Sequence, residues 1–151
     1  MTPTTTPATP ITLPTVPDKV PTMLSSTKTL GDLLEREPVV VMPTTTLLGA
    51  CKVLAEEVVG LVLVADHARL RGVLSERDIV RALAEGADPA NDRVGEWMTE
   101  EICTLDVTTS VRDALEALVD NQIRHVVVTK GTQPLGVVSE RALADAALKN
   151  D

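Results

Sequence analysis

The chain has 151 residues, a formal net charge of −8 at pH 7 and almost no aromatic side chains, with one Trp and no Phe or Tyr. Proteins that bind nucleic acid neutralise phosphates with basic side chains and often stack bases on aromatic rings, so this composition argues against a nucleic-acid partner. No apolar run approaches the roughly 20 residues of a membrane-spanning helix, and no basic patch followed by an apolar segment indicates a signal peptide. Two cysteines, Cys51 and Cys103, are too few for a disulfide framework. We therefore expect a cytoplasmic protein with two buried thiols and no membrane partner.

The first 28 residues differ in composition from the rest of the chain. Six of the ten prolines lie between Pro3 and Pro21, interleaved with threonines. Proline removes backbone donors and the segment lacks apolar periodicity, so neither a helix nor a strand is predicted. We interpret residues 1–28 as a disordered arm, with a partner-docking or phosphorylated tail as the open alternative.

From residue 29 onward, helical and strand patterns alternate. Thr29 can cap a helical turn over 31–36, and 38–42 is predicted to be extended. Thr46 then begins a helix, because apolar residues follow it at helical spacing. These residues are Leu47, Ala50, Cys51, Leu54 and Val58.

Two strands and a helix are expected next. The continuous apolar run over 61–65 suits a buried strand. A polar turn through Asp66 and His67 leads to a second strand over 70–74. Ser75 is the expected cap of a helix that ends near Ala84.

The second half of the chain predicts the same order of elements. The expected ranges are an extended 102–105, a helix over 110–121, strands over 125–129 and 135–138, and a last helix over 139–148. Ser110-Val-Arg-Asp113 matches the capping-box pattern, which supports the start of the first of these helices.

The second half also repeats the residues of the first, 64 positions later and without a gap. Gly72-Val-Leu-Ser75-Glu-Arg-Asp78 returns as Gly136-Val-Val-Ser139-Glu-Arg-Ala142, and Leu61-Val-Leu-Val64 returns as His125-Val-Val-Val128. An internal duplication is a strong guide to architecture. It predicts a pseudo-symmetric pair of units of about 60 residues, whose differences indicate which half of a shared site still works.

The turn at Ser75 has the chemistry of a ligand site. A strand ends and a helix begins there, so unpaired backbone N–H groups and the helix dipole favour an anion. The Ser75 hydroxyl can add a donor to a phosphate, and the carboxylate of Asp78 can accept both hydroxyls of a ribose. The alternative is structural, because Ser75-x-x-Asp78 is itself a capping box. The turn alone does not decide between the two.

With these motifs the chain resembles the CBS-domain family, named after cystathionine β-synthase. The resemblance rests on a tandem β-α-β-β-α unit, an apolar strand preceded by Arg124-His125, and the Gly-apolar-x-Ser/Thr-x-x-Asp turn at 72–78. It implies an α/β (α+β) fold, with repeats at 29–87 and 88–151 packed through their sheets as a pseudo-twofold pair. It also implies two clefts between the repeats that hold adenosine-containing ligands such as AMP, ATP or S-adenosylmethionine.

In the family, each cleft combines the Asp of one repeat with the basic pair and first strand of the other. Carried over, Ser75, Arg77 and Asp78 face Arg124 and His125 across one cleft. Ile102 and Cys103 lie on the first strand of the second repeat, and Cys103 either lines the adenine pocket or is a core thiol. The opposite cleft keeps only Gly60, Leu61, Ser139 and Ala142. We therefore expect one working nucleotide site and one degenerate one.

These residues predict a stand-alone regulatory sensor that binds an adenosine-containing ligand, needs no cofactor and modulates an unidentified protein partner. Catalysis is not expected, because no nucleophile, base and orienting group stand together, and two distant histidines do not indicate a zinc site. The alternative is a structural dimerisation module without a ligand. A homodimer is expected in either case, because apolar helix residues are predicted to stay exposed. These are Val80 and Leu83 on one helix and Leu143 and Leu148 on its counterpart.

Overall fold

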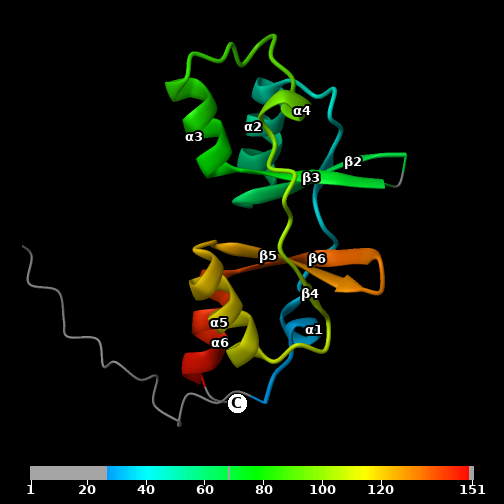
Figure 1. The fold of residues 1–151 in the computed structure, drawn as a ribbon, viewed down its shortest axis with the longest axis vertical. Helices are drawn as coiled ribbons and strands as arrows, with labels where there is room; N and C mark the ends of the chain where they lie inside the picture. Colours follow the sequence, from blue (N-terminus) through cyan, green and yellow to red (C-terminus); the bar gives the residue numbers. More distant parts are fainter. Residues whose placement is uncertain (1–26, 68, 150–151) are drawn as a thin grey trace, which may run out of the picture.

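A computed structural model describes residues 27–67 and 69–149 of the chain as two three-stranded sheets that face each other, each covered on its outer side by helices (Figure 1). This is the α/β (α+β) arrangement of tandem β-α-β-β-α repeats that the sequence predicts. The expected disordered arm lies outside the described residues, apart from Thr27 and Lys28. Within the described part, no helix combines the length and the hydropathy that crossing a membrane requires.

The first sheet is formed by β1 (Val40–Val41), β2 (Leu61–Asp66) and β3 (Arg69–Ser75), in that order. β1 runs parallel to β2, and β3 runs antiparallel to it. The helices α2 (Leu47–Glu57) and α3 (Glu76–Ala84) cover this sheet. Each begins at a hydroxyl cap predicted from the sequence. Thr46 accepts a hydrogen bond from the N–H of Gly49, and Ser75 accepts one from that of Asp78.

The second sheet repeats this pattern with β4 (Thr104–Asp106), β5 (His125–Lys130) and β6 (Gln133–Ser139), covered by α5 (Val111–Asn121) and α6 (Glu140–Lys149). The registers agree, since Leu61 pairs with Ser75 and His125 pairs with Ser139. Two local predictions need correction. β4 starts two residues later than expected, so Ile102 and Cys103 precede it.

The second correction concerns the start of α5. The Ser110 hydroxyl accepts from the N–H of Asp113, but the described residues show no return bond from the Asp113 carboxylate. The expected capping box is therefore only half formed.

Each of the two short helices packs against the sheet of the other repeat. α1 (Leu30–Leu33) comes first in the chain, yet Leu30 belongs to the core under the second sheet, and its N–H donates to the carbonyl of Thr109 (2.9 Å). α4 (Val94–Trp97) packs on the first sheet, where the N–H of Val94 donates to the carbonyl of Thr45 (2.8 Å). Figure 1 shows α1 beside the second sheet and α4 beside α2. We call β1–β3 with α2–α4 the first unit, and β4–β6 with α5, α6 and α1 the second unit.

The crossing segments explain the motif glycines. A Cβ on Gly72 would lie 2.6 Å from the carbonyl oxygen of Thr99, and one on Gly136 would lie 2.7 Å from Cδ2 of Leu34. Gly72 therefore leaves room for the backbone of the linker around Thr99, whereas at Gly136 the close atom is the movable end of a side chain and the linker backbone, the carbonyl oxygen of Arg36, is 3.5 Å away. The first linker leads into β1, and the second, between α4 and β4, joins the two units.

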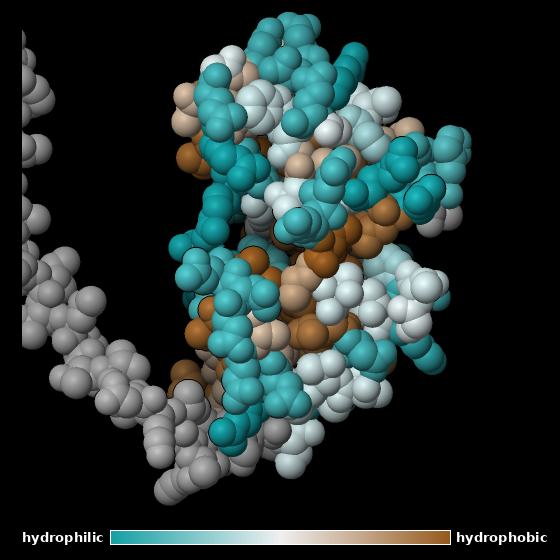
Figure 2. Space-filling view, viewed as in Figure 1, coloured by the Kyte–Doolittle hydropathy of each residue, from teal (hydrophilic) through white to brown (hydrophobic). Residues whose placement is uncertain are grey.

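The two sheets meet through an apolar layer made of Leu61, Leu63, Val73 and Val127, with Leu70, Ile102 and Val137 at its edge. On β2, alternate residues instead face the helices, as Val62 and Val64 do. Because both faces of the strand are covered, it reads as the continuous apolar run seen in the sequence. Figure 2 shows apolar atoms gathered where the two units meet, between more polar ends.

The exposed helix residues are partly as predicted. Val80, Leu83 and Leu148 are 67%, 49% and 69% exposed, but Leu143 is fully buried under the second sheet. Leu143 and Leu148 are five residues apart, about 1.4 helical turns, so they lie on different faces of α6. Leu143 shares the inward face with Ala146 and Ala147, and the prediction that it stays exposed is wrong.

Candidate ligand-binding clefts

The first cleft lies between the two units and has a volume of about 530 Å³. Its walls come from the β3–α3 turn, from the linker around 99–103 and from the start of β5. The structure brings all seven residues selected from the sequence to this cleft, namely Ser75, Arg77, Asp78, Ile102, Cys103, Arg124 and His125. They come from both units, so a molecule held here would touch both.

Asp78 is the most tightly held of these residues and is only 5% exposed. One carboxylate oxygen, Oδ2, accepts from the N–H (2.9 Å) and the hydroxyl (3.1 Å) of Ser75, which completes a capping box at the start of α3. The other, Oδ1, accepts from Nη2 of Arg81 (2.9 Å) and from the hydroxyl of Thr99 (3.0 Å). The Ser75–Asp78 turn thus has the structural role of a capping box, and it places the carboxylate at the cleft.

The start of α3 offers fewer free donors than the sequence indicates. The N–H of Glu76 donates to the carbonyl of Gly60 (3.0 Å), and the N–H of Asp78 donates to Ser75 Oγ (3.1 Å). An anion in this cleft would therefore depend on side chains more than on the helix terminus. Arg77 and Arg124, both exposed, are the cations available for that role.

His125 is half-buried at the meeting point of the sheets. Burial lowers the pKa of its imidazole, the carboxylate of Glu76 raises it, and the guanidinium groups of Arg124 and Arg77 lower it further, while Glu140 raises it. The net effect is a lowered pKa, so the ring is neutral at pH 7 and can both donate and accept a hydrogen bond.

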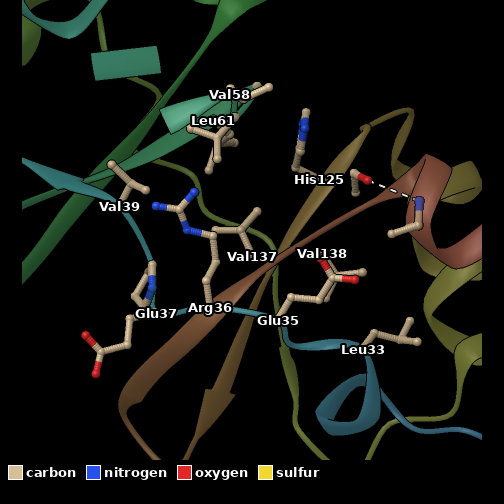
Figure 3. A pocket seen from close by; sticks show the side chains of 15 residues that line it. Leu33, Glu35, Arg36, Glu37, Val39, Val58, Leu61, His125, Val137 and Val138 are labelled. Atoms are coloured by element: carbon tan, nitrogen blue, oxygen red, sulfur yellow. Dashed lines mark hydrogen bonds between the residues drawn. The ribbon is translucent and has the colours of Figure 1, made fainter. Parts of the chain in front are cut away.

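The second cleft, of about 380 Å³, lies on the other side of His125 (Figure 3). It contains the four residues expected for a degenerate site, which are Gly60, Leu61, Ser139 and Ala142. At the position of Asp78 stands Ala142, whose N–H donates to the Ser139 hydroxyl (3.1 Å) and which has no carboxylate to offer.

The charges around the second cleft do not favour a phosphate. The guanidinium of Arg36 projects across the cleft (Figure 3), but it donates to the carbonyl of Glu57 (2.9 Å) and forms an ion pair with the Glu57 carboxylate. Glu35 and Glu37 add two negative charges to the lining. The one cation contributed by the linker is therefore already neutralised by a neighbour.

Sequence reasoning missed several residues of the first cleft. Arg81 could have been found, because it lies one helical turn after Asp78, at a spacing typical of ion pairs. Thr99 gives no local signal, since its contact with Asp78 joins residues 21 positions apart. Glu101, Asn121 and Ile123 also line the cleft. Three residues, Gly60, Leu61 and His125, line both clefts.

The fold and the clefts define a class of protein, a tandem-repeat module with two ligand-sized spaces between pseudo-symmetric units. The family model of the CBS domain matches residues 30–85 and 94–149. The chain therefore belongs to the CBS-domain family, as the resemblance predicts.

Two curated relatives illustrate the similarity. A 17.7 kDa protein of Acidianus ambivalens is 37% identical over 111 residues, which cover 72% of this chain and 66% of that protein. Hypoxic response protein 1 of Mycobacterium tuberculosis is 34% identical over 101 residues, covering 66% of this chain and 71% of that protein. The chain thus spans about two thirds of the length of these relatives.

Solved structures agree with the fold. A CBS domain protein from Pyrobaculum aerophilum, complexed with AMP, is 33% identical with a TM-score of 0.70, over 76% of this chain and 89% of that one. Hypoxic response protein I with two coordinated zinc ions is 29% identical with a TM-score of 0.67, over 78% of this chain and 98% of that one. In the described part of the present chain, no three His, Cys, Asp or Glu side chains are grouped to hold a metal ion.

Proposed function

We propose that this protein is a regulatory module, not an enzyme, that binds an adenosine-containing ligand of the AMP, ATP or S-adenosylmethionine type in the first cleft and modulates a protein partner. The observation that carries the proposal is the distribution of functional groups between the clefts. Asp78, Arg77 and Arg124 line only the first cleft, and Ala142 takes the place of Asp78 in the second, whereas His125, Gly60 and Leu61 line both. A relative at 33% identity, complexed with AMP, supports the same class of ligand.

The residues suggest how such a ligand would lie. Asp78 is the acceptor for ribose hydroxyls, because a carboxylate offers several acceptor positions and no donor. Arg77 and Arg124 bind a phosphate, and their charge favours nucleotides over uncharged nucleosides. Ile102, packed against the apolar layer between the sheets, and Cys103, packed against the core of the second unit, are both half-buried and form the side of the cleft that suits a base.

A ligand in this position would act by bridging the units. It would contact α3 of the first unit and β5 of the second, so its binding free energy would stabilise one relative arrangement of the two. A partner that distinguishes this arrangement would then respond to the ligand concentration.

The first test is a thermal-shift screen with AMP, ADP, ATP, S-adenosylmethionine and NAD. We expect a concentration-dependent rise in the unfolding temperature with at least one nucleotide, because a ligand that binds only the folded state stabilises it. No shift with any of the five would favour the alternative, a structural dimerisation module without a ligand.

Assembly into a homodimer is the second part of the proposal. Val80 and Leu83 on α3 and Leu148 on α6 are large, exposed apolar residues, and both helices lie on the same flank of the molecule (Figure 1). A self-complementary apolar surface closes most readily as a twofold dimer. Light scattering should report a dimer that persists after deletion of residues 1–28, since that segment has no periodic apolar face.

A pair of variants locates the dimer surface. Leu83→Glu should give a monomer at micromolar concentration. Val58→Glu, at another exposed valine on the C-terminal end of α2, should leave the dimer intact. A wild-type monomer, or a dimer unaffected by Leu83→Glu, would contradict this assignment.

A further inference from the structure

The carboxylate of Asp78 has no free acceptor position in the structure. Its two oxygens together accept four hydrogen bonds, two from Ser75, one from Arg81 and one from Thr99. A carboxylate offers about four lone-pair sites. A ligand hydroxyl can therefore reach Asp78 only if one of these donors leaves.

The four hydrogen bonds to Asp78 differ in the free energy that is lost when each is broken. The two bonds from Ser75 hold the first turn of α3 together. All four bonds are charge-assisted because the acceptor is a carboxylate, and the bond from Arg81 is in addition an ion pair, so its loss would leave two opposite charges separated. The hydroxyl of Thr99 is an uncharged donor like a ribose hydroxyl, so exchanging one for the other keeps the number and kind of bonds at Asp78.

We propose that Thr99 is a positioning residue that sets the ligand affinity of the first cleft by occupying Asp78 in the empty state and yielding to a ligand hydroxyl. The proposal rests on the proposed function, because it concerns the regulation of the same site. In this proposal the hydroxyl of Thr99 competes with a ligand hydroxyl for the Asp78 carboxylate. When the ligand hydroxyl replaces it, the segment that carries Thr99 is released.

That segment is the linker between the units. Besides the side-chain bond, Thr99 exchanges two backbone hydrogen bonds with Val73, N–H to carbonyl in both directions (2.9 and 2.8 Å), where the linker crosses Gly72. α4 ends two residues earlier, at Trp97. Two of these three bonds hold Thr99 on β3 and the third holds it on α3, so loss of the side-chain bond releases the linker from α3 and communicates occupancy of the cleft to the connection between the units.

The second cleft has no equivalent of the hydrogen bond between Thr99 and Asp78. The positions equivalent to Asp78 and Thr99 are Ala142 and Glu35, which cannot form the same hydrogen bond. The first linker is held instead by Arg36, through its bonds to Glu57 of α2. The hydroxyl–carboxylate contact is therefore specific to the cleft that retains the nucleotide-binding groups.

Calorimetric titration with AMP tests the exchange. Thr99→Val removes the hydroxyl and keeps the branched shape, whereas Thr99→Ser keeps the hydroxyl. Thr99→Val should bind AMP roughly ten- to a hundredfold more tightly than the wild type, the factor that corresponds to one hydrogen bond to a charged group. Thr99→Ser should bind with the wild-type affinity. Equal or weaker binding by Thr99→Val would overturn the proposal, because Thr99 would then be uninvolved or a direct ligand contact.

Tryptophan fluorescence tests the release of the linker. Trp97 is the single aromatic residue of the chain, and its indole N–H is buried without a hydrogen-bond partner among the described residues. AMP should shift the emission of the wild type, and ligand-free Thr99→Val should already emit close to the AMP-bound wavelength. If ligand-free Thr99→Val emits like the ligand-free wild type, the linker is not released and that part of the proposal is wrong.

The two proposals can fail separately. If neither the wild type nor Thr99→Val binds any of the five ligands of the thermal-shift screen, both are contradicted. If the wild type binds AMP and Asp78→Ala does not, while Thr99→Val shows no gain, the proposed function holds and the competitor role of Thr99 is overturned. Thermal unfolding of both Thr99 variants shows whether each is folded before titration.

Discussion

The imidazole of His125 lies directly against Gly60, with Nε2 3.1 Å from the position that a Cβ of residue 60 would occupy. In the repeat alignment, His125 corresponds to Leu61 and Gly60 to Arg124. One repeat thus places a basic pair where the other has a glycine and a leucine. The imidazole forms the partition between the two clefts, and it brings a titratable group into the layer between the sheets.

This position predicts how stability depends on pH. The pKa of His125 is lowered in the folded chain, mainly by burial, whereas the unfolded chain has the ordinary value of about 6.5. Between the two values the unfolded state binds more protons. The contribution of neutral His125 to the unfolding free energy is therefore fully present above about pH 6.5. It is lost as the pH falls from there through the lowered pKa of the folded chain.

Urea unfolding of the wild type and of His125→Leu, at about pH 7.5 and 5.5, measures the effect. Leucine is the residue that the first repeat uses at this position. The wild type should lose more stability than the variant on acidification, because the variant has no imidazole to protonate. Both proteins contain the exposed His67, so the difference between them reports on His125 alone. An equal loss of stability in both would show that protonation of His125 does not destabilise the fold.

Replacement of Asp78 should reduce ligand binding and stability together. Asp78→Ala is expected to weaken AMP binding by about 1.5–3 kcal/mol, the range for hydrogen bonds to a charged group. It should also lower the unfolding free energy by about 1 kcal/mol, because the carboxylate half of the capping box on α3 is lost while the Ser75 cap remains. Calorimetry and chemical denaturation measure the two effects separately.

Asp32 provides the matched control. Its carboxylate accepts from the N–H and the hydroxyl of Thr29, as that of Asp78 does from Ser75, but it does not line the first cleft. Asp32→Ala should reduce stability and leave AMP binding unchanged. If both variants lose affinity equally, the effect belongs to folding and not to ligand contact.

The two cysteines provide a chemical footprint of the first cleft. Burial raises the pKa of both thiols, so each should react slowly with iodoacetamide at pH 7, because the thiolate is the reactive form. Cys103 lines the cleft, whereas Cys51 lies on α2 against the core of the first unit. AMP should slow alkylation of Cys103 and leave that of Cys51 unchanged, as measured by mass spectrometry of peptides. Equal rates for Cys103 with and without AMP would remove it from the site.

The helices and strands could be predicted because capping residues and apolar spacing within each segment define them. The cap at Thr46 and the apolar positions after it define α2, and the unbroken run at 61–65 marks a strand covered on both faces. The two clefts could also be distinguished from the sequence alone, because the repeat puts Asp78 and Ala142 at the same position. Comparison within one chain therefore supplied information that no single motif contains.

The features that could not be predicted depend on contacts between distant segments. The exchange of α1 and α4 between the units follows from how the linkers cross Gly136 and Gly72, and no local pattern encodes it. The contact of Thr99 with Asp78 depends on the same crossing. The burial of Leu143 has a signal in the repeat, since Leu143 aligns with Ile79 and both positions are apolar. Both side chains lie on the inward faces of their helices.

Restoring a carboxylate to the second cleft should not restore a nucleotide site. Ala142→Asp adds the missing acceptor, but Gly60 and Leu61 still stand in place of the basic pair, and Arg36 remains paired with Glu57. The AMP stoichiometry measured by calorimetry should be the same as for the wild type. A second equivalent bound by this variant would show that the missing cations are not required.

Titration calorimetry of the purified protein with AMP measures whether the cleft between Asp78 and Arg124-His125 is the nucleotide site and the other cleft is not. Saturation at one equivalent of AMP per chain, lost in Asp78→Ala and retained in Asp32→Ala, is the predicted result. Saturation at two equivalents, or binding that survives Asp78→Ala unchanged, would contradict it.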